Sequence, residues 1–208
     1  MAGTGTTTNY DVTHIQQGPG DLWIVGGGVA DSPTPQLTLD PVGSLWTPDS
    51  TAYPSSVHLG AADGATTIAV TPKMEEIKID QCDAPVGFFL QSLEMSLEVE
   101  LKQLDPALIQ NCAPFGAYAH QASPGYSQLT FGGLAGGSPT GLCVAFISNK
   151  RGASGKVVVA ILFNAVGQLG LSTTVGRAKQ SIYKAQFKGF ADLTRTAGRQ
   201  VGVIYETL

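Results

Sequence analysis

Charge and long apolar runs are both scarce in this sequence of 208 residues. Only 13% of the residues are charged, about half the ~25% of an average soluble domain. The longest apolar stretch, Val157–Phe163, is far shorter than the roughly 20 residues that a membrane-spanning helix requires. The 26 glycines and 12 prolines exclude a coiled coil, and the glycines lack the three-residue period of collagen. Because 43% of the residues are hydrophobic, the composition favours a folded, turn-rich protein built mainly of β-strands.

Cysteine and histidine are also rare, and they form no recognisable ligand pattern. The cysteines form no CxxC pair and the histidines stand alone, so the spacing argues against a zinc site. We expect buried free thiols, as is usual in a reducing cytoplasm. The first 20 residues contain neither a basic region nor an apolar run, and they do not resemble a signal peptide. The residues concerned are Cys82, Cys112, Cys143, His14, His58 and His120.

The sequence contains no motif that indicates catalysis or phosphate binding. Its glycine-rich pieces match neither a dinucleotide fingerprint nor a P-loop, and a GxSxG nucleophile motif is absent. Isolated histidines such as His58 and His120 are more typical of surface or satisfied core groups than of general bases. The 12 basic residues are dispersed and are outnumbered by 16 acidic ones, unlike those of a nucleic-acid-binding surface. We therefore expect no enzymatic activity, no cofactor and no metal.

Alternation of apolar and polar residues predicts several half-buried antiparallel strands. The alternation is regular over Leu93–Lys102 and recurs over Ser181–Phe190. The continuously apolar segments Gly141–Ser148 and Lys156–Asn164 are predicted to form a hairpin that is covered on both faces. Further strands are expected at Asp21–Val25, Met74–Gln81, Ser127–Phe131 and Gln200–Tyr205.

Turn and capping residues predict two more local elements. The dipeptide Asp63-Gly64 predicts a hairpin between Val57–Leu59 and Thr67–Val70, because it tolerates the positive φ of a primed turn. One short helix is predicted to begin at Asp105, an N-cap that is followed by proline, and to end near Cys112.

Residues 1–208 are predicted to form one domain, because no internal repeat, linker or change of composition divides the chain. Residues 1–20 form a polar N-terminal arm. Residues 26–56 form a long loop, and loops of that length usually have a function or a partner. The larger apolar side chains of this loop either form a contact surface or fold back onto the core. They are Leu37, Leu39, Trp46 and Tyr53.

The order of these segments resembles a known family. Glu76–Gln81 (EIKIDQ) is followed by Ala84–Val86 (APV), an alternating strand and a short helix, and this order resembles the tail-tube (major tail) proteins of long-tailed, siphovirus-like bacteriophages. Lys184–Glu206 is similar to the closing strands of that family. The resemblance implies an antiparallel β-sandwich or partly closed barrel with one short flanking α-helix and long loops, whose copies assemble into hexameric rings stacked into a hollow tube.

The resemblance also implies a place and partners for the protein. It implies a structural virion protein of the phage tail, made in the cytoplasm of the host bacterium and without membrane insertion. Its partners would be copies of itself and other tail proteins, namely the tape measure, terminator and distal tail proteins. Double-stranded DNA would pass through the tube without specific binding.

The dimensions of such a tube are physically reasonable. If each of six subunits contributes four strands, ~4.8 Å apart and tilted by ~40°, the circumference is about 150 Å and the bore about 40 Å. Acidic side chains on its wall would repel DNA phosphates and keep passage quick. In the alternative, the same side chains face bulk solvent outside the tube. These lumen candidates are Glu76, Asp80, Glu94, Glu98 and Glu100, and the N-terminal arm and the 26–56 loop are the candidates for ring-to-ring contact.

Two other functions are compatible with the sequence. One is a related tube or terminator protein of a virion or secretion system, and a terminator should stop assembly at one ring. The other is a carbohydrate-binding β-sandwich, which would present a cluster of exposed aromatic side chains, whereas Trp23 and Trp46 are the only tryptophans.

Overall fold

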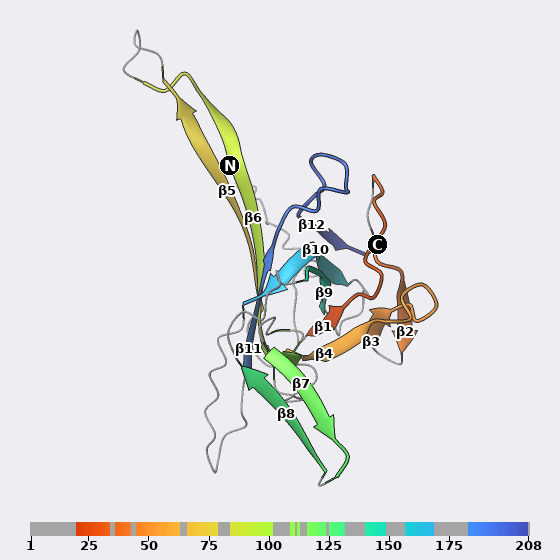
Figure 1. Ribbon diagram of the computed structural model, residues 1–208. Helices are drawn as coiled ribbons and strands as arrows, with labels where there is room; N and C mark the ends of the chain where they lie inside the picture. The colour runs from red at the N-terminus through yellow and green to blue at the C-terminus, as the bar shows by residue number, and fades with distance from the viewer. Residues whose placement is uncertain are drawn as a thin grey trace, which may run out of the picture.

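The computed structural model describes residues 20–33, 36–42, 45–62, 66–78, 84–101, 109–110, 112, 116–123, 125–131, 140–148, 157–168 and 183–207. Within these residues the protein is mainly β, as predicted, and its sheets are antiparallel (Figure 1). No helix of the described residues is long and apolar enough to cross a bilayer. The strands are β1 (Gly20–Ile24), β2 (Leu39–Val42), β3 (Leu45–Pro48), β4 (Val57–Ala61), β5 (Thr67–Ile77), β6 (Gly87–Leu101), β7 (Gly116–Gln121), β8 (Tyr126–Phe131), β9 (Leu142–Ser148), β10 (Val158–Gly167), β11 (Tyr183–Gly189) and β12 (Gly202–Glu206).

Eight strands form one hydrogen-bonded sheet in the order β4-β1-β9-β10-β11-β6-β5, with β12 attached to β10. Strand β10 changes partner along its length, because Val158–Leu162 pair with β12 and Ala165–Gly167 pair with β11. The pairing of β10 with β9 is irregular at the same point. The sheet therefore branches at β10. Over the described residues it is not closed, although Ala62 forms an isolated bridge with Leu101 of β6.

The first core cluster joins side chains of β6 and β11 to those of β1, β9 and β10. Phe146 and Leu162 belong to it, together with Leu97 and Phe187, which are almost fully buried. Every second residue of β11 and of the second half of β6 faces this cluster, which confirms the predicted alternation. Full burial of one side chain of this size stabilises the fold by about 1.5–3 kcal/mol.

The second core cluster covers the opposite face of β9 and β10. Ile147, Val159 and Ile161 alternate along these strands with residues of the first cluster, so the prediction of a hairpin covered on both faces is confirmed. The free thiols of Cys112 and Cys143 are buried, as expected, one in each cluster. Cys82 lies outside the described residues.

Arg195 fastens the loop between β11 and β12 to the segment that follows β1. Its guanidinium carbon lies 3.6 Å from the centroid of the Phe163 ring. Two of its nitrogens donate hydrogen bonds to the carbonyl oxygens of Val29 and Ala30, and its Nε donates to Asp192 Oδ2 at 3.1 Å. Because Arg195 is buried, these contacts replace the water that the charged group loses on folding.

The predicted hairpin between Val57–Leu59 and Thr67–Val70 is wrong. Strand β4 pairs with β1, whereas β5 pairs with β6. A turn dipeptide indicates a change of chain direction, but the pairing partner depends on which distant faces are buried together. Strand β5 also continues through Pro72, which is tolerated because β5 lies at the end of the strand order.

The predictions for the 26–56 loop, the short helix and the N-terminal arm have different outcomes. The 26–56 loop is not free of regular structure, because it contains the hairpin formed by β2 and β3. Ile109, Gln110 and Cys112 are helical, in agreement with the predicted helix, and the rest of that helix lies outside the described residues. The N-terminal arm, described only at Gly20, and Asp80 also lie outside them.

Candidate functional site

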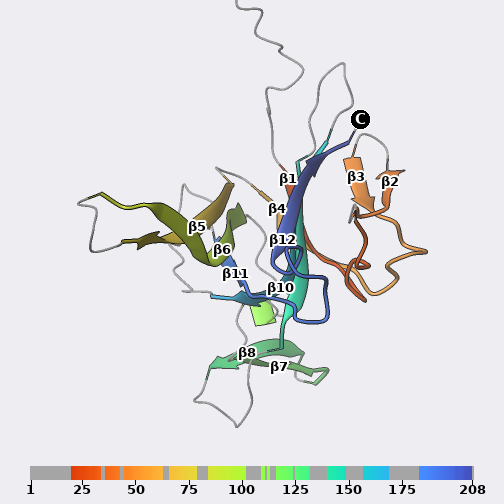
Figure 2. The same ribbon diagram turned by 90° about the horizontal axis from the view of Figure 1, so that it is seen from above.

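A two-stranded hairpin extends from the body of the protein beyond the end of β11. Strand β11 pairs with β6 only over Ser96–Leu101, so the earlier part of β6 has β5 as its partner. We call residues 70–77 of β5 and 87–94 of β6 the β-arm. Figures 1 and 2 show it projecting from the body in both views. An isolated hairpin of two strands is at best marginally stable in water, and the β-arm is supported by its continuity with the sheet of the body.

One face of the β-arm continues the face that forms the first core cluster. Val70 lies opposite the buried Met95, and Met74 lies opposite Leu90. Residues directly opposite each other share a face, and every second residue of β5 lies on that same face. We call the exposed apolar residues of this face the apolar strip. Its members, which are between 43% and 63% exposed, are Val70, Met74, Phe88, Leu90 and Leu93.

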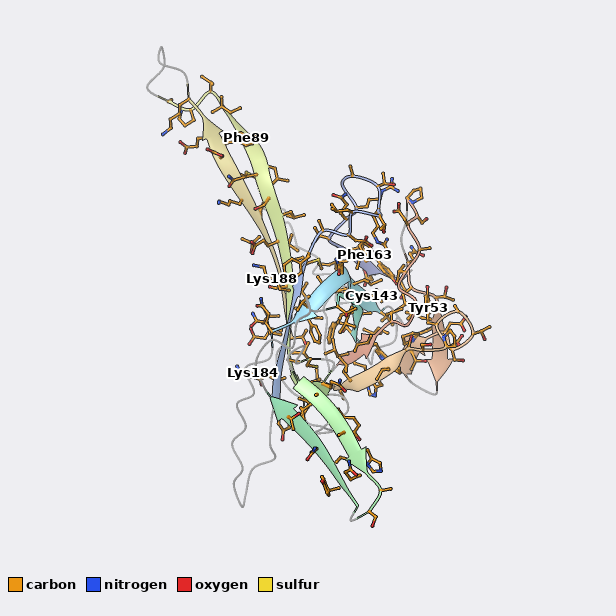
Figure 3. The ribbon with its side chains drawn as sticks, in the orientation of Figure 1. Tyr53, Phe89, Cys143, Phe163, Lys184 and Lys188 are labelled. Atoms are coloured by element: carbon orange, nitrogen blue, oxygen red, sulfur yellow. The ribbon has the colours of Figure 1, made fainter. Side chains whose placement is uncertain are left out.

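Apolar side chains are also exposed on the other face of the β-arm, toward its end. Phe89 lies opposite Glu75 and Ile77 lies opposite Gly87, and both apolar side chains are substantially exposed. Figure 3 shows Phe89 far out on the β-arm. Contiguous exposed apolar surface of this kind is uncommon on a soluble monomer and usually marks an interaction site.

The body carries a polar face on the side of β6 and β11 that points away from the first core cluster. Lys184 Nζ lies 3.1 Å from Glu100 Oε1 and 3.8 Å from Glu98 Oε1. Lys188 Nζ lies 2.9 Å from Glu94 Oε2. The hydrogen bond to Glu100, with the charges of Glu100 and Glu98, raises the pKa of Lys184. We call these five residues the charged ladder, and Figure 3 shows both lysines on β11.

A polar groove lies beside the charged ladder. It is lined by hydroxyl, amide and charged groups from β5, β6 and β11 and from Gln168, which directly follows β10. Three neighbouring strands and the residue that follows β10 thus line one polar surface. The lining residues are Thr71, Glu94, Ser96, Gln168, Gln186 and Lys188.

The predicted lumen candidates do not all lie together. Glu94 and Glu98 share the polar face with Glu100, in agreement with the alternation of β6. Glu76 instead lies opposite Phe88, on the face of the apolar strip, and pairs with Lys78 at 3.1 Å. The lysines of β11 also offset much of the negative charge, a feature that the pattern of β6 alone did not predict.

The predicted contact residues of the 26–56 segment belong to the core. Leu37 is 4% exposed, and its backbone N–H donates to Tyr205 Oη at 2.8 Å. Leu39, Trp46 and Tyr53 pack against the second core cluster. Of the two interpretations left open by the sequence, the structure favours the one in which the segment folds back onto its own chain.

The histidines considered as bases make simple polar contacts. His58 Nε2 lies 3.2 Å from Asp21 Oδ1, and its ring stacks at 4.6 Å on that of Trp23. His120 Nδ1 lies 3.0 Å from the hydroxyl of Ser127 on the exposed β7–β8 hairpin. Within the part of the chain that the structure describes, no three His, Cys, Asp or Glu residues gather as metal ligands would.

Sequence reasoning missed the β-arm as a site. Phe88, Phe89 and Leu90 fell between a predicted break and a predicted strand and were given no role. Their apolar character was visible in the sequence, but their exposure depends on β11 ending at Gly189. No family model matches this chain, and no curated protein is significantly similar to it. Its function is therefore inferred from the residues and the geometry described above.

Proposed function

We propose that this protein is a structural subunit that assembles with copies of itself into stacked hexameric rings, forming the hollow tail tube of a long-tailed phage through which DNA passes. The observation that carries the proposal is the apolar strip of the β-arm. It continues the core face of the sheet, and no described part of the same chain buries it. A surface of this kind usually marks the place where another molecule binds.

Covering the strip would offset part of the free-energy cost of association. Each of its five side chains is roughly half exposed, and covering it would contribute about 1 kcal/mol. The total of about 5 kcal/mol is comparable to the lower estimates for the loss of translational and rotational freedom on association. Association would then depend on cooperative contacts among many copies, as in a ring or a tube.

The sheet offers a suitable wall for a tube. Three adjacent strands, β11, β6 and β5, contribute to the polar face and its groove, and β10 continues the same sheet beside them. Four strands from each of six subunits correspond to a barrel about 150 Å in circumference. Strand β5 ends the strand order, so its free edge can pair with a neighbouring subunit. In this arrangement the open sheet of each subunit becomes part of a closed assembly.

The charged ladder suits a wall that DNA passes without being held. Three glutamates and two lysines leave an excess of one negative charge in the ladder. Such a surface gives phosphates no cluster of unpaired cations to bind. The candidates for facing the lumen are therefore Glu94, Glu98 and Glu100, whereas Glu76 lies on the opposite face of the β-arm.

Negative-stain electron microscopy of the purified protein tests the assembly. The wild-type protein should form hollow tubes, and the Leu90→Asp variant should stay monomeric because a charge in the apolar strip cannot be buried there. The matched control is Ser92→Asp, which places the same charge on the same strand but on the opposite face. Wild-type protein that stays monomeric at high concentration, or a Leu90→Asp variant that forms normal tubes, would contradict the proposal.

Replacing Glu94, Glu98 and Glu100 by lysine tests the lumen wall. The triple variant should still form tubes, but particles that carry it should eject DNA more slowly and infect less well, because the wall would then bind phosphates. Unchanged ejection from normal tubes would place this face outside the lumen. Fibre length in the same micrographs distinguishes a tube protein from a terminator, which stops at one ring.

A further inference from the structure

We infer that the apolar strip of one copy binds the β7–β8 hairpin of the next copy, so that the subunits are joined head to tail along the tube. This inference rests on the self-assembly proposed above. It assigns a specific partner surface to the β-arm. It also assigns a function to the β7–β8 hairpin, whose described residues belong to neither core cluster.

The positions of the two hairpins fit a head-to-tail contact. Figure 1 shows the β-arm and the β7–β8 hairpin projecting from opposite ends of the body, and they are also apart in Figure 2. A copy displaced along the line between them brings its β7–β8 hairpin to the β-arm of the copy below. Contacts between two different surfaces that do not close on themselves produce linear assemblies, whereas a contact of the β-arm with itself would stop at a pair.

The chemistry of the β7–β8 hairpin suits burial against an apolar surface. Residues 116–131 contain no Asp, Glu, Lys or Arg. Among the described strands, β7 and β8 pair only with each other. Tyr126 is 46% exposed. Burying an uncharged, partly aromatic hairpin avoids the large desolvation cost of a charged group.

Four polar side chains of the β7–β8 hairpin have hydrogen-bond partners within it. The hydroxyl of Ser127 lies 3.2 Å from Tyr118 Oη and 3.0 Å from His120 Nδ1. The hydroxyl of Thr130 donates to the carbonyl oxygen of Ala117 at 3.1 Å. Tyr126 shares a face with Thr130, whose hydroxyl keeps its bond when a second molecule covers that face. The amides of Gln121 and Gln128 on the same face would take partners from the bound molecule. The exposed faces of two such two-stranded ribbons can stack as sheets do, about 10 Å apart.

Another exposed apolar side chain provides the competing partner. Leu193 in the loop between β11 and β12 is 82% exposed. The same loop also contains the charged residues Asp192 and Arg199. Figure 1 shows this loop at the same end of the body as the β-arm. A contact of the β-arm with this loop would join subunits side by side and not head to tail.

Cross-linking between variants with single added cysteines distinguishes these arrangements. The background carries Cys82→Ser and keeps the buried Cys112 and Cys143. Leu90→Cys is mixed in equal amounts with a differently tagged Tyr126→Cys variant or, as the control, with Leu193→Cys. Each mixture is assembled and treated with a short bismaleimide. The Leu90–Tyr126 mixture should yield at least ten times more cross-linked heterodimer than the Leu90–Leu193 mixture, and at least ten times more than the homodimer that either variant forms alone.

The outcomes separate this inference from the proposed function. Tubes without the Leu90–Tyr126 cross-link, or with Leu90–Leu193 or Leu90–Leu90 as the main product, would overturn the inference and leave the tube function standing. Absence of any assembly in the wild type would overturn both. A second variant needs no cysteine: Tyr126→Arg should raise the protein concentration needed for assembly at least fivefold without changing the thermal unfolding of the monomer. Thr51→Arg, at an exposed turn, is the matched control, and equal effects of both would count against the hairpin contact.

Discussion

The two halves of strand β6 place similar side chains in opposite environments. From Met95 to Leu101 every second residue is buried against the first core cluster, whereas Phe88, Leu90 and Leu93 on the β-arm are exposed. The apolar content of the two halves is similar. They differ because β11 and the body cover one half and no described part of the chain covers the other. Exposure of the β-arm is thus a property of the tertiary structure and not of the local sequence.

The same substitution in both halves of β6 should separate stability from assembly. Leu97→Ala removes a side chain that is 1% exposed, and it should lower the free energy of unfolding by about 3 kcal/mol. Leu90→Ala should change the unfolding of the monomer by less than about 0.5 kcal/mol while weakening assembly. Chemical denaturation, with sedimentation as the assay of assembly, gives both values. Equal losses of monomer stability would show that the β-arm is part of the folded core.

Substitution of Arg195 tests how much one buried side chain contributes to the stability of the body. Arg195→Ala leaves the buried carbonyl oxygen of Val29 and the part-buried one of Ala30 without their donor and removes the contact with Phe163, so the free energy of unfolding should fall by about 2–3 kcal/mol. Arg195→Lys should recover little of this loss, because an ammonium group cannot reproduce the planar, multiple donors of a guanidinium. Full recovery by lysine in thermal denaturation would show that charge alone matters at this position.

The smallest expected effect concerns the two buried thiols of the body, and it appears only at alkaline pH. Burial raises the pKa of Cys112 to about 12 and that of Cys143 to about 11. In the unfolded chain these thiols ionise near the ordinary value of 9.0, so the unfolded state releases protons first, and stability should fall as the pH rises above 9. The Cys112→Ser variant should lose less stability between pH 8 and about 10.5 than the wild type does. An identical pH dependence in urea denaturation would contradict burial of this thiol.

Patterns that depend on one strand were predictable from the sequence. The alternation of Leu93–Lys102 and Tyr183–Lys188 identified which side chains are buried, because a half-buried strand must alternate. The continuous apolar runs of β9 and β10 correctly indicated cover on both faces.

Features that depend on distant parts of the chain were not predictable. The Asp63-Gly64 dipeptide predicted that β4 and β5 would pair, but their partners are β1 and β6. Trp46 and Tyr53 pack on the second core cluster, although the polar composition around them is equally compatible with an exposed loop. The lysines that offset Glu94 and Glu98 come from β11, far along the chain, and only the strand register brings them together.

The change of partner along β10 has a mechanical consequence. Among the described strands, β10 is hydrogen-bonded to three others, namely β9, β11 and β12. The β-arm is joined to it by a continuous ladder through β6 and β11. A pull on the β-arm along its strands would therefore load many backbone hydrogen bonds at once in shear, and the force would pass through β10 into both core clusters. A protein built in this way resists extension as a whole sheet, and the proposed tube would need this property in order to bend without separating.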